Sequence, residues 1–506
     1  MTKIISQSKI ANIVSSIKKN KKTVVMCHGA FDVLHYGHIA HFEEAKKQGD
    51  ILIVSITSDQ FINKGPNRPF FNQDIRLRTV ASLQVVDYVT LSESDVAISN
   101  ITKIKPNIYC KGPDYKNNKE DITGNIKREI DAIKKVNGKI FYTKAVTYSS
   151  SKLINIFSDN FTEGQKKFLN KIKSKHTIYY INKAIESLSK QKVLTIGETI
   201  IDEYVFCEAI GKSGKEPVLV LKEKKTEKYL GGIGSVANNI SEIVDNIKIL
   251  SLIGDQNTDL NFIKKNLNKR IKLNFIKKEN SPTILKKRFV DEIDSKKLLG
   301  VYKINDDSIS HKLKLKLKKI ILNEISKVDT VIVVDYGHGF LDSELSNIIS
   351  KKSKFICVNT QINSFNVGTQ RINKYKSPDC LIINESELRH ELRDSISSID
   401  FLAKKIWEII KYKKLVVTCG SLGAMIFNAR AKNKVHCPAF AGKIVDKVGS
   451  GDAMLSMISI CLKSGLSDEL SLFLGSIAAA KSVESIGNSY YLKKIDLLKS
   501  VTYMLK

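Results

Sequence analysis

The sequence contains no run of apolar residues long enough to cross a membrane, although 42% of its 506 residues are hydrophobic. A transmembrane helix needs about 20 consecutive apolar residues. Residues 1–20 are polar and lack the apolar segment of a secretory signal peptide. We therefore expect a cytoplasmic protein with no membrane partner and with enough apolar residues to build sizeable cores.

Paired cysteines are absent as well. The eight cysteines are scattered along the chain, and no two of them form a C-x-x-C motif. Structural zinc sites and disulfide frameworks need clustered cysteines. We expect reduced, mostly buried thiols.

Acidic residues are too few to balance the basic ones, because 52 Asp and Glu against 82 Lys and Arg give a formal net charge of +30. Such an excess is typical of proteins that bind nucleic acids or anionic membranes, but lysines on solvated faces produce it too. Lysine dominates here and is spread over the whole chain, whereas nucleic-acid binders usually concentrate arginine. We expect no nucleic-acid partner, and a charge that attracts phosphorylated substrates.

Apolar strand patterns alternate with helical patterns over residues 1–158. Short apolar runs predict strands at residues 24–27, 51–56, 85–91, 107–110 and 140–142. Helical periodicity lies between them, for example at residues 38–48 and 75–83. Such alternation is typical of a parallel, doubly wound sheet, so we expect a Rossmann-like α/β domain here.

The pattern weakens over residues 159–190, which are rich in Lys, Ser and Asn. We expect a linker or a bridging helix there. From residue 191 to residue 506 the alternation of strands and helices resumes, beginning with a predicted strand at 193–197, and β-rich segments at 204–206 and 217–222 precede the first long helix. This order predicts a second α/β domain with a small β lid.

A segment rich in glycine and histidine follows the first predicted strand and spans residues 28–38. His35 and His38 lie three residues apart, so they share one face of the first helical turn. The start of a helix offers free backbone N–H groups and a partial positive charge. An H-x-x-H pair can also be half of a metal site or plain helix surface. The strand–glycine–helix context favours two imidazoles that hold the α-phosphate of a nucleotide.

This segment resembles the cytidylyltransferase-like family of nucleotidyltransferases, whose members use ATP or CTP. The likeness extends to residues 64–69, 111–115 and 149–151, and it is strongest for bifunctional heptose kinase/adenylyltransferases. It implies that a sugar phosphate attacks the α-phosphorus of the nucleotide and that pyrophosphate leaves with Mg²⁺. The implied site comprises catalytic His35 and His38, with Gly29, Phe31, Lys64, Arg76, Lys111, Asp114, Ser149, Ser150 and Ser151 around the nucleotide.

A second glycine-rich segment, residues 446–452, leads into an apolar helical pattern. Gly449, Ser450 and Gly451 are small enough for backbone N–H groups to converge on a γ-phosphate at the helix start. Asp452 then lies in the first turn, where a carboxylate can take the proton of an acceptor hydroxyl. The alternative is a glycine-bounded helix whose aspartate favours the helix dipole.

The second segment resembles the D-x-x-G-[AS]-G-D signature of ribokinase-like sugar kinases of the PfkB family, and four further motifs follow that family's order over residues 191–490. The resemblance implies that Asp452 is the base and that Gly449, Ser450 and Gly451 form the anion hole. It assigns sugar binding to Asp202, Gly231 and Gly232, indirect Mg²⁺ binding through water to Asn384 and Glu387, and ATP binding to Thr418, Gly420 and Gly423. Lys286 and Arg288 are candidates for a distal substrate phosphate or, equally, part of a surface strand.

Several positions depart from the families that the chain resembles. In bifunctional heptose enzymes the kinase precedes the transferase, and here the order is reversed. Ser235 stands where that kinase has asparagine, and His338 stands where its D-Y-x-K-G loop has lysine. These departures leave the sugar undetermined.

The leading hypothesis is a bifunctional enzyme. Its kinase phosphorylates a sugar or sugar phosphate, with heptose 7-phosphate the first candidate, and its transferase moves AMP from ATP to a sugar 1-phosphate, giving an ADP-sugar for surface glycan or lipopolysaccharide synthesis. One alternative keeps both chemistries but uses CTP and another sugar or polyol phosphate. A distant alternative is a basic scaffold or nucleic-acid-binding protein. By analogy with family kinases, the chain is also a candidate homodimer through the lid.

Overall fold

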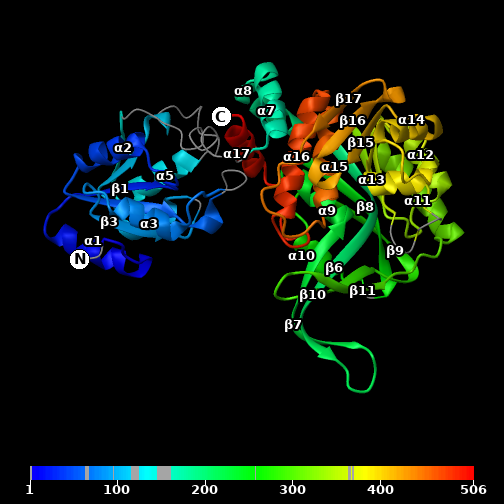
Figure 1. The fold of residues 1–506 in the computed structure, drawn as a ribbon, viewed down its shortest axis with the longest axis horizontal. Coiled ribbons are helices and arrows are strands. Elements are labelled where there is room, and N and C mark those ends of the chain that lie inside the picture. Colours follow the sequence, from blue (N-terminus) through cyan, green and yellow to red (C-terminus); the bar gives the residue numbers. More distant parts are fainter. Residues whose placement is uncertain are drawn as a thin grey trace. The chain divides into compact units, whose positions relative to one another are not determined.

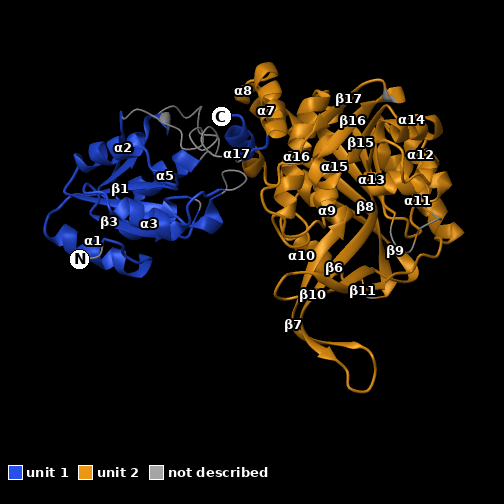
Figure 2. Ribbon diagram, viewed as in Figure 1, with its two compact units in different colours: residues 1–162, 498–506 blue, residues 163–497 orange. Residues whose placement is uncertain are grey.

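The computed structural model describes residues 3–62, 68–94, 96–115, 125–144, 161–256, 258–362, 366 and 370–506. The chain divides into two compact units, shown in Figure 2: Met1–Thr162 together with Leu498–Lys506, and Glu163–Leu497. Within the described part of the chain, no helix is both long enough and apolar enough to cross a membrane.

The first unit contains a five-stranded parallel sheet in the order β3-β2-β1-β4-β5 (Figure 1). Alternate residues of β1 point to opposite faces, so Val25 joins one core cluster and Met26 the other. The first cluster lies under α2 and α3, and the second lies under α1, α4 and α5. This is the Rossmann-like arrangement expected from the sequence. The strands are Val24–Gly29 (β1), Ile51–Thr57 (β2), Tyr88–Ser92 (β3), Ile108–Lys111 (β4) and Lys139–Tyr142 (β5), and the helices are Gln7–Lys19 (α1), Tyr36–Lys46 (α2), Gln73–Ala81 (α3), Ile98–Ile104 (α4) and Asn125–Lys135 (α5).

The second unit is built around β6, Lys192–Lys212, which pairs with four other strands. Its first half lies in a mainly parallel sheet between β8 and β12, and its second half pairs with β7 and β10. This second half, with β7, β10 and β11, forms the small β lid that the sequence predicted. The remaining strands are Leu219–Gly232 (β7), Asn246–Gln256 (β8), Lys272–Pro282 (β9), Ile284–Asp291 (β10), Lys297–Lys303 (β11), Thr330–Asp335 (β12), Ile356–Thr360 (β13), Cys380–Asn384 (β14), Lys414–Thr418 (β15), Ala424–Asn428 (β16) and Lys434–Cys437 (β17).

Helices cover both faces of the larger sheet. The core cluster on one face includes buried residues of α11, α12, α13 and α14, while α9, α15 and α16 pack together on the other (Figure 1). The helices of this unit are Glu163–Lys175 (α7), Ile178–Ser187 (α8), Ile233–Ser241 (α9), Leu260–Asn266 (α10), His311–Ile325 (α11), Ser343–Lys352 (α12), Glu385–Leu392 (α13), Ile399–Ile410 (α14), Ser450–Lys463 (α15), Asp468–Val483 (α16) and Lys494–Met504 (α17), whose last residues group with the first unit.

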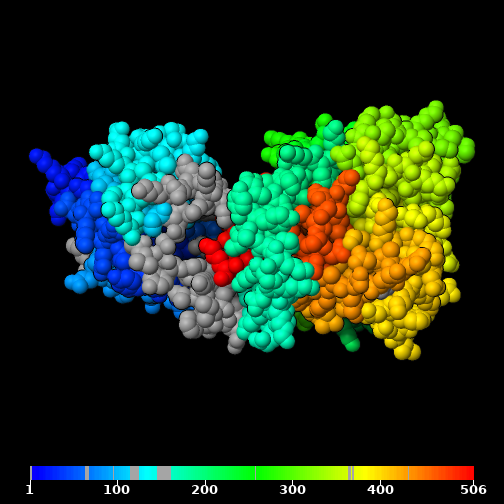
Figure 3. Space-filling model, turned by 90° about the horizontal axis from the view of Figure 1, so that it is seen from above, coloured from blue at the N-terminus to red at the C-terminus, as the bar shows by residue number. Residues whose placement is uncertain are grey.

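The segment for which the sequence predicted a linker or bridging helix contains α7 and α8, which belong to the second unit. Lys171 and Lys175 of α7 form ion pairs with Glu469 of α16. Figure 3 shows these helices, in green-cyan, at the surface beside the orange-red residues of α16. Buried Phe168 also packs against Phe473, so α7 is anchored by both apolar and charged contacts.

Candidate active sites

The first site lies where β1 ends and α2 begins. His35 is the N-cap residue of α2, and its ring stacks on that of His38 with 3.8 Å between centroids. Phe31 has a φ of +47°, an uncommon value for a residue with a side chain, and its ring contacts His38 edge-on. Burial lowers the pKa of His35, which favours a neutral ring. The two histidines therefore stand together at the amino end of a helix, as the sequence predicted.

Glycine 29 leaves the room that this arrangement needs. A Cβ at Gly29 would lie 3.1 Å from the Phe31 ring, tighter than nearly all real contacts. A side chain at Gly29 would therefore press on the Phe31 ring, which contacts His38.

Two buried charges shape the loops around this site. The Asp32 carboxylate accepts the backbone N–H groups of Phe70 and Phe71 at 2.8 and 2.9 Å, and it pairs with Arg68 at 2.7 Å. The Arg76 guanidinium donates to Ala30 O, Phe71 O and the Asp59 carboxylate. Arg76 is only 1% exposed, so it ties the loop after β1 to the segment before α3.

Only some of the remaining predicted residues of the first site lie among the described residues. Lys111, at the end of β4, pairs with Glu129 at 2.8 Å, and its ammonium lies 4.5 Å from the Tyr115 ring centroid. Asp114 lies in a short 3₁₀ turn, Pro113–Tyr115. Lys64, Ser149, Ser150 and Ser151 lie outside the described residues.

The second site is formed at the start of α15. Gly449 is the N-cap residue, with a φ of +88°, and a Cβ there would collide with the Asn488 side chain. Gly451 has open space where a Cβ would lie. Ser450 Oγ donates to Lys447 O at 3.0 Å, so its side chain turns back toward the loop. The first turn of α15 consequently presents bare backbone, as an anion hole requires.

Asp452 lies in the first turn of this helix. Its Oδ1 accepts a hydrogen bond from Tyr336 OH at 3.2 Å. Burial raises the pKa of Asp452 to about 7, and the nearby negative charge of Asp202 acts in the same direction. A carboxylate with this pKa is suited to proton transfer near neutral pH.

Asp202, at the base of the lid, is an ion-pair partner of Arg288. A Cβ at Gly231 would overlap the Asp202 carboxylate, so glycine is required for these two strands to approach as they do. Gly232 adopts a φ of +55° at the start of α9. These contacts bring all three predicted sugar-binding residues to one place.

Lys286 lies beside the same group and is only 7% exposed, so it is not part of a surface strand. Its ammonium lies 5.2 Å from the Tyr336 ring centroid. Burial lowers the pKa of Lys286, against the opposing charges of Asp202, Glu198 and Asp452.

Three partners in this site were given no role by the sequence analysis, although two of them lie in motifs that it quoted: Tyr336, Asn488 and Asp446. Asn488 contacts Asp202 at 3.5 Å and accepts from Ser235 at 3.0 Å. Asp446 binds Tyr204 OH at 2.7 Å and Lys297 at 2.6 Å, which joins the glycine loop to the lid strands. The aspartate that opens the glycine-rich signature was the available signal for Asp446.

The remaining kinase motifs lie at the ends of β14 and β15. Asn384 and Glu387 form a capping box on α13, in which Asn384 Oδ1 accepts Glu387 N at 2.8 Å and Glu387 Oε2 accepts Asn384 N at 3.1 Å. Burial raises the pKa of Glu387 to about 7. Thr418 ends β15, and Gly420 and Gly423 follow it with φ values of +57° and +94°.

A parallel α/β sheet, a β lid over one end of it, and an aspartate at a glycine-rich helix start define the larger unit as a carbohydrate kinase of the ribokinase type. Residues 190–494 match the family described as pfkB family carbohydrate kinase, and the chain belongs to this family. Residues 26–156 match the cytidylyltransferase-like family, which confirms the expected nature of the first domain.

Similar curated proteins carry the name Bifunctional protein HldE. One from Campylobacter concisus (strain 13826) is 41% identical over 124 residues, 24% of this chain and 26% of that protein. One from Desulfatibacillum aliphaticivorans is 26% identical over 320 residues, 60% of this chain and 62% of that protein. One from Helicobacter pylori (strain G27) is 26% identical over 322 residues, 62% of this chain and 67% of that protein. The chain thus spans about a quarter to two thirds of the relatives it matches, and the resemblance inferred from the motifs is confirmed.

Solved structures support the fold of the larger unit. Ribokinase from Giardia lamblia matches with a TM-score of 0.50 and 15% identity, covering 61% of this chain and 98% of that one. Phosphofructokinase-2 from Escherichia coli in complex with substrates and products matches with a TM-score of 0.50 and 15% identity, covering 62% and 100%.

Proposed function

We propose that the chain is a bifunctional sugar-activating enzyme with two separate reaction centres. The kinase centre phosphorylates a sugar or sugar phosphate with ATP, and heptose 7-phosphate is the substrate we propose. The transferase centre joins AMP from ATP to a sugar 1-phosphate and yields an ADP-sugar for surface glycan or lipopolysaccharide synthesis. Membership of the pfkB family, the cytidylyltransferase-like match and the likeness to Bifunctional protein HldE support this proposal.

The observation that carries the kinase assignment is the position of Asp452 at the open start of α15, hydrogen-bonded to Tyr336. In the proposed reaction Asp452 takes the proton of the acceptor hydroxyl. The oxygen forms a bond to the γ-phosphorus while the bond from that phosphorus to the β–γ bridging oxygen breaks, and ADP leaves. Backbone N–H groups of residues 449–451 stabilise the transferring phosphoryl group, and Asp202, Gly231 and Gly232 hold the sugar.

Lys286 and Arg288 complete the proposed sugar site. Both lie on β10 beside Asp202, with their charges facing buried carboxylates. We assign them to the sugar phosphate end of the substrate.

Magnesium fits the donor set at the start of α13. Amide and carboxylate oxygens suit Mg²⁺. Burial raises the pKa of the Glu387 carboxyl, and a nearby cation would stabilise the charged form of that carboxyl. Asn384 and Glu387 already accept each other's backbone N–H groups, so they would hold the ion through water. Bound magnesium would offset the charge of the ATP phosphates.

The stacked pair of His35 and His38 carries the transferase assignment. A phosphate oxygen of the sugar 1-phosphate attacks the α-phosphorus of ATP, and pyrophosphate departs. We propose that the two imidazoles hold the α-phosphate as its charge grows, with Gly29 and Phe31 shaping the contact and Lys64, Arg76, Lys111, Asp114 and Ser149–Ser151 contributing to the nucleotide site.

A matrix of sugar phosphates against ATP and CTP tests both halves. ADP release reports the kinase, and pyrophosphate release reports the transferase. We expect Asp452→Asn to abolish only ADP release and His35→Ala to abolish only pyrophosphate release. Loss of both activities in either variant would contradict two separate centres, and faster turnover with CTP and a polyol phosphate would replace the ADP-sugar assignment.

Because the net charge is +30, the alternative of a nucleic-acid-binding protein needs a test of its own. Tight, salt-sensitive binding to random DNA without ATP turnover would favour a scaffold or nucleic-acid-binding role. We expect neither.

We also propose a cytoplasmic homodimer that joins through the lid. Large apolar side chains are exposed on the lid strands, including Ile210, Leu219 and Leu299, and a second copy of the chain would cover them. Sedimentation of the wild type and of Leu219→Lys tests this, because the charge should yield monomers. A monomeric wild type at micromolar concentration would disprove it.

A further inference from the structure

Among the described residues, the buried side chain of His338 makes no hydrogen bond. It is 3% exposed, and across the described residues neither of its ring nitrogens has a hydrogen-bond partner. Buried polar groups are nearly always satisfied in native proteins. Two such atoms on one ring leave both nitrogens available to a ligand that enters the site.

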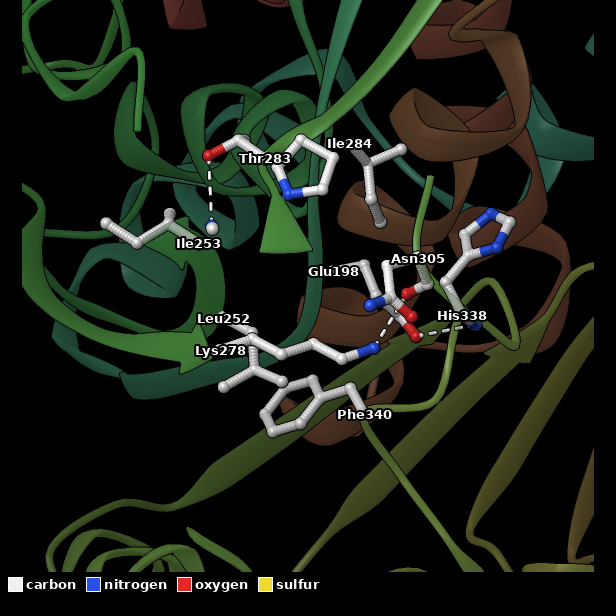
Figure 4. A pocket seen from close by; sticks show the side chains of 11 residues that line it. Glu198, Leu252, Ile253, Lys278, Thr283, Ile284, Asn305, His338 and Phe340 are labelled. Atoms are coloured by element: carbon white, nitrogen blue, oxygen red, sulfur yellow. Dashed lines mark hydrogen bonds between the residues drawn. The ribbon is translucent and has the colours of Figure 1, made fainter. Parts of the chain in front are cut away.

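His338 lines a pocket whose open space, including the solvent at its mouth, is about 320 Å³. Figure 4 shows His338 beside Ile284, with Lys278, Glu198 and Asn305 grouped below and Phe340 closing the far side. The enclosed part of the pocket is small, so it suits one end of a substrate and not a complete nucleotide.

The charges in the pocket favour a neutral ligand group. The Lys278 ammonium donates to Asn305 O and Asp307 O, both at 2.7 Å, and faces the opposing charges of Asp306, Asp307 and Glu198. Its positive charge is therefore largely offset by its surroundings.

The imidazole is neutral as well. Burial lowers the pKa of His338 to about 4, and the positive charges of Lys286 and Lys278 act in the same direction. A neutral imidazole offers one N–H donor and one acceptor on opposite sides of its ring, and two hydroxyl groups can satisfy them because a hydroxyl group both donates and accepts.

The pocket lies close to the proposed kinase centre. Ile284, in the pocket wall, pairs with Ile200, and Lys286 pairs with Asp202 two residues further along the same strands. Two residues of strand span roughly 7 Å. His338 also lies two residues after Tyr336, the hydrogen-bond partner of Asp452. A sugar bound between Asp202 and Asp452 is long enough to reach this pocket.

We propose that His338 recognises hydroxyl groups of the kinase substrate, with one ring nitrogen donating to one hydroxyl group and the other ring nitrogen accepting from a second. This specificity contact rests on the proposed kinase function. It assigns the pocket to the neutral, hydroxyl-bearing part of the sugar and not to its phosphate.

The first test follows the ring nitrogens of His338 by NMR in the ¹⁵N-histidine-labelled full chain, with the signal assigned by its absence in His338→Leu. The probes are heptose 7-phosphate, unphosphorylated heptose and inorganic phosphate. We expect both heptoses to move the His338 signal at saturation and inorganic phosphate to leave it unchanged. Movement with inorganic phosphate alone, or with none of the three, would overturn the proposal.

The second test separates recognition from packing. We expect His338→Leu to raise the KM for heptose 7-phosphate by roughly 10- to 100-fold, because both hydrogen bonds from the ring are lost, with little change in kcat or in the KM for ATP. His338→Gln, which keeps one polar group, should fall in between, and exposed His390→Leu is the matched control. An unchanged KM together with a higher melting temperature would mean that His338 only fills space.

These outcomes also separate the pocket from the proposed function. No turnover of any sugar, with the His338 signal still moved by heptose, would remove the kinase assignment and keep the pocket. Normal turnover with an unchanged KM in His338→Leu would remove the proposed role of His338 and keep the kinase assignment.

Discussion

At the scale of single residues, the pKa of Asp452 sets a pH dependence. As a base Asp452 acts only when it is deprotonated, so kcat/KM of the kinase should fall about tenfold per pH unit below about 7 and level off above it. Tyr336 donates a hydrogen bond that lowers the pKa of Asp452, so Tyr336→Phe should move the midpoint to higher pH. A pH–rate profile from 5 to 9 measures both. An identical midpoint in the two proteins would argue against Asp452 as the titrating group.

The buried pair of Asp202 and Arg288 gives a second prediction at this scale. Removing one partner leaves an unpaired buried charge, which costs about 3–5 kcal/mol, so Arg288→Met should markedly lower the urea midpoint of the kinase unit. The double variant Asp202→Asn with Arg288→Met removes both charges and should recover much of that stability. Its KM for the sugar should stay high, because the contacts to substrate are gone. A double variant no more stable than Arg288→Met would contradict an ion pair with this energetic role.

The residues predicted from the sequence are those that lie close together in the chain. Gly449, Ser450, Gly451 and Asp452 form one local motif, and the structure places them at one helix start. Tyr336 and Asn488 were not predicted, because they reach Asp452 and Asp202 only through strand order and helix packing. Arg76 was predicted to lie around the nucleotide from its position, which could not reveal that its guanidinium also donates to Ala30 O, Phe71 O and Asp59.

At the scale of elements, the two ends of α15 offer a matched pair of glycines. Gly449 begins the helix and Gly465 follows it, with φ values of +88° and +75°. Alanine is strained at both, by about 1 kcal/mol, but only at Gly449 would its Cβ meet the Asn488 side chain. We expect Gly449→Ala to reduce kinase kcat at least a hundredfold and Gly465→Ala to lower stability slightly with near-normal kcat. ADP-release assays and thermal melts distinguish the two, and equal activities would remove Gly449 from the proposed anion hole.

Strand β6 shows why element boundaries differ from those predicted. The sequence suggested separate strands at 193–197 and 204–206, because Glu198, Asp202 and Glu203 interrupt the apolar pattern. In the structure these acidic residues are buried inside one strand, with Glu198 accepting two backbone N–H groups and Asp202 pairing with Arg288. Polar residues whose partners lie far away in the sequence interrupt the apolar pattern that predicts a strand, but they do not interrupt the strand itself.

At the scale of the whole molecule, each unit has its own hydrophobic core, and this was predictable because both halves show a complete alternation of strands and helices. Separate cores imply that the units can lose stability separately. Phe42 in the first unit and Phe427 in the second are both fully buried, so they form a matched pair of probes for the stability of the two units.

Replacing either phenylalanine by alanine should cost about 3–5 kcal/mol in its own unit. We expect Phe42→Ala to lower the temperature at which pyrophosphate release is lost and to leave ADP release at its wild-type temperature. Phe427→Ala should give the reverse, and calorimetry should show one of two transitions moving in each case. If either substitution shifts both transitions equally, the two units fold as one cooperative body and the independence of their activities has no structural basis.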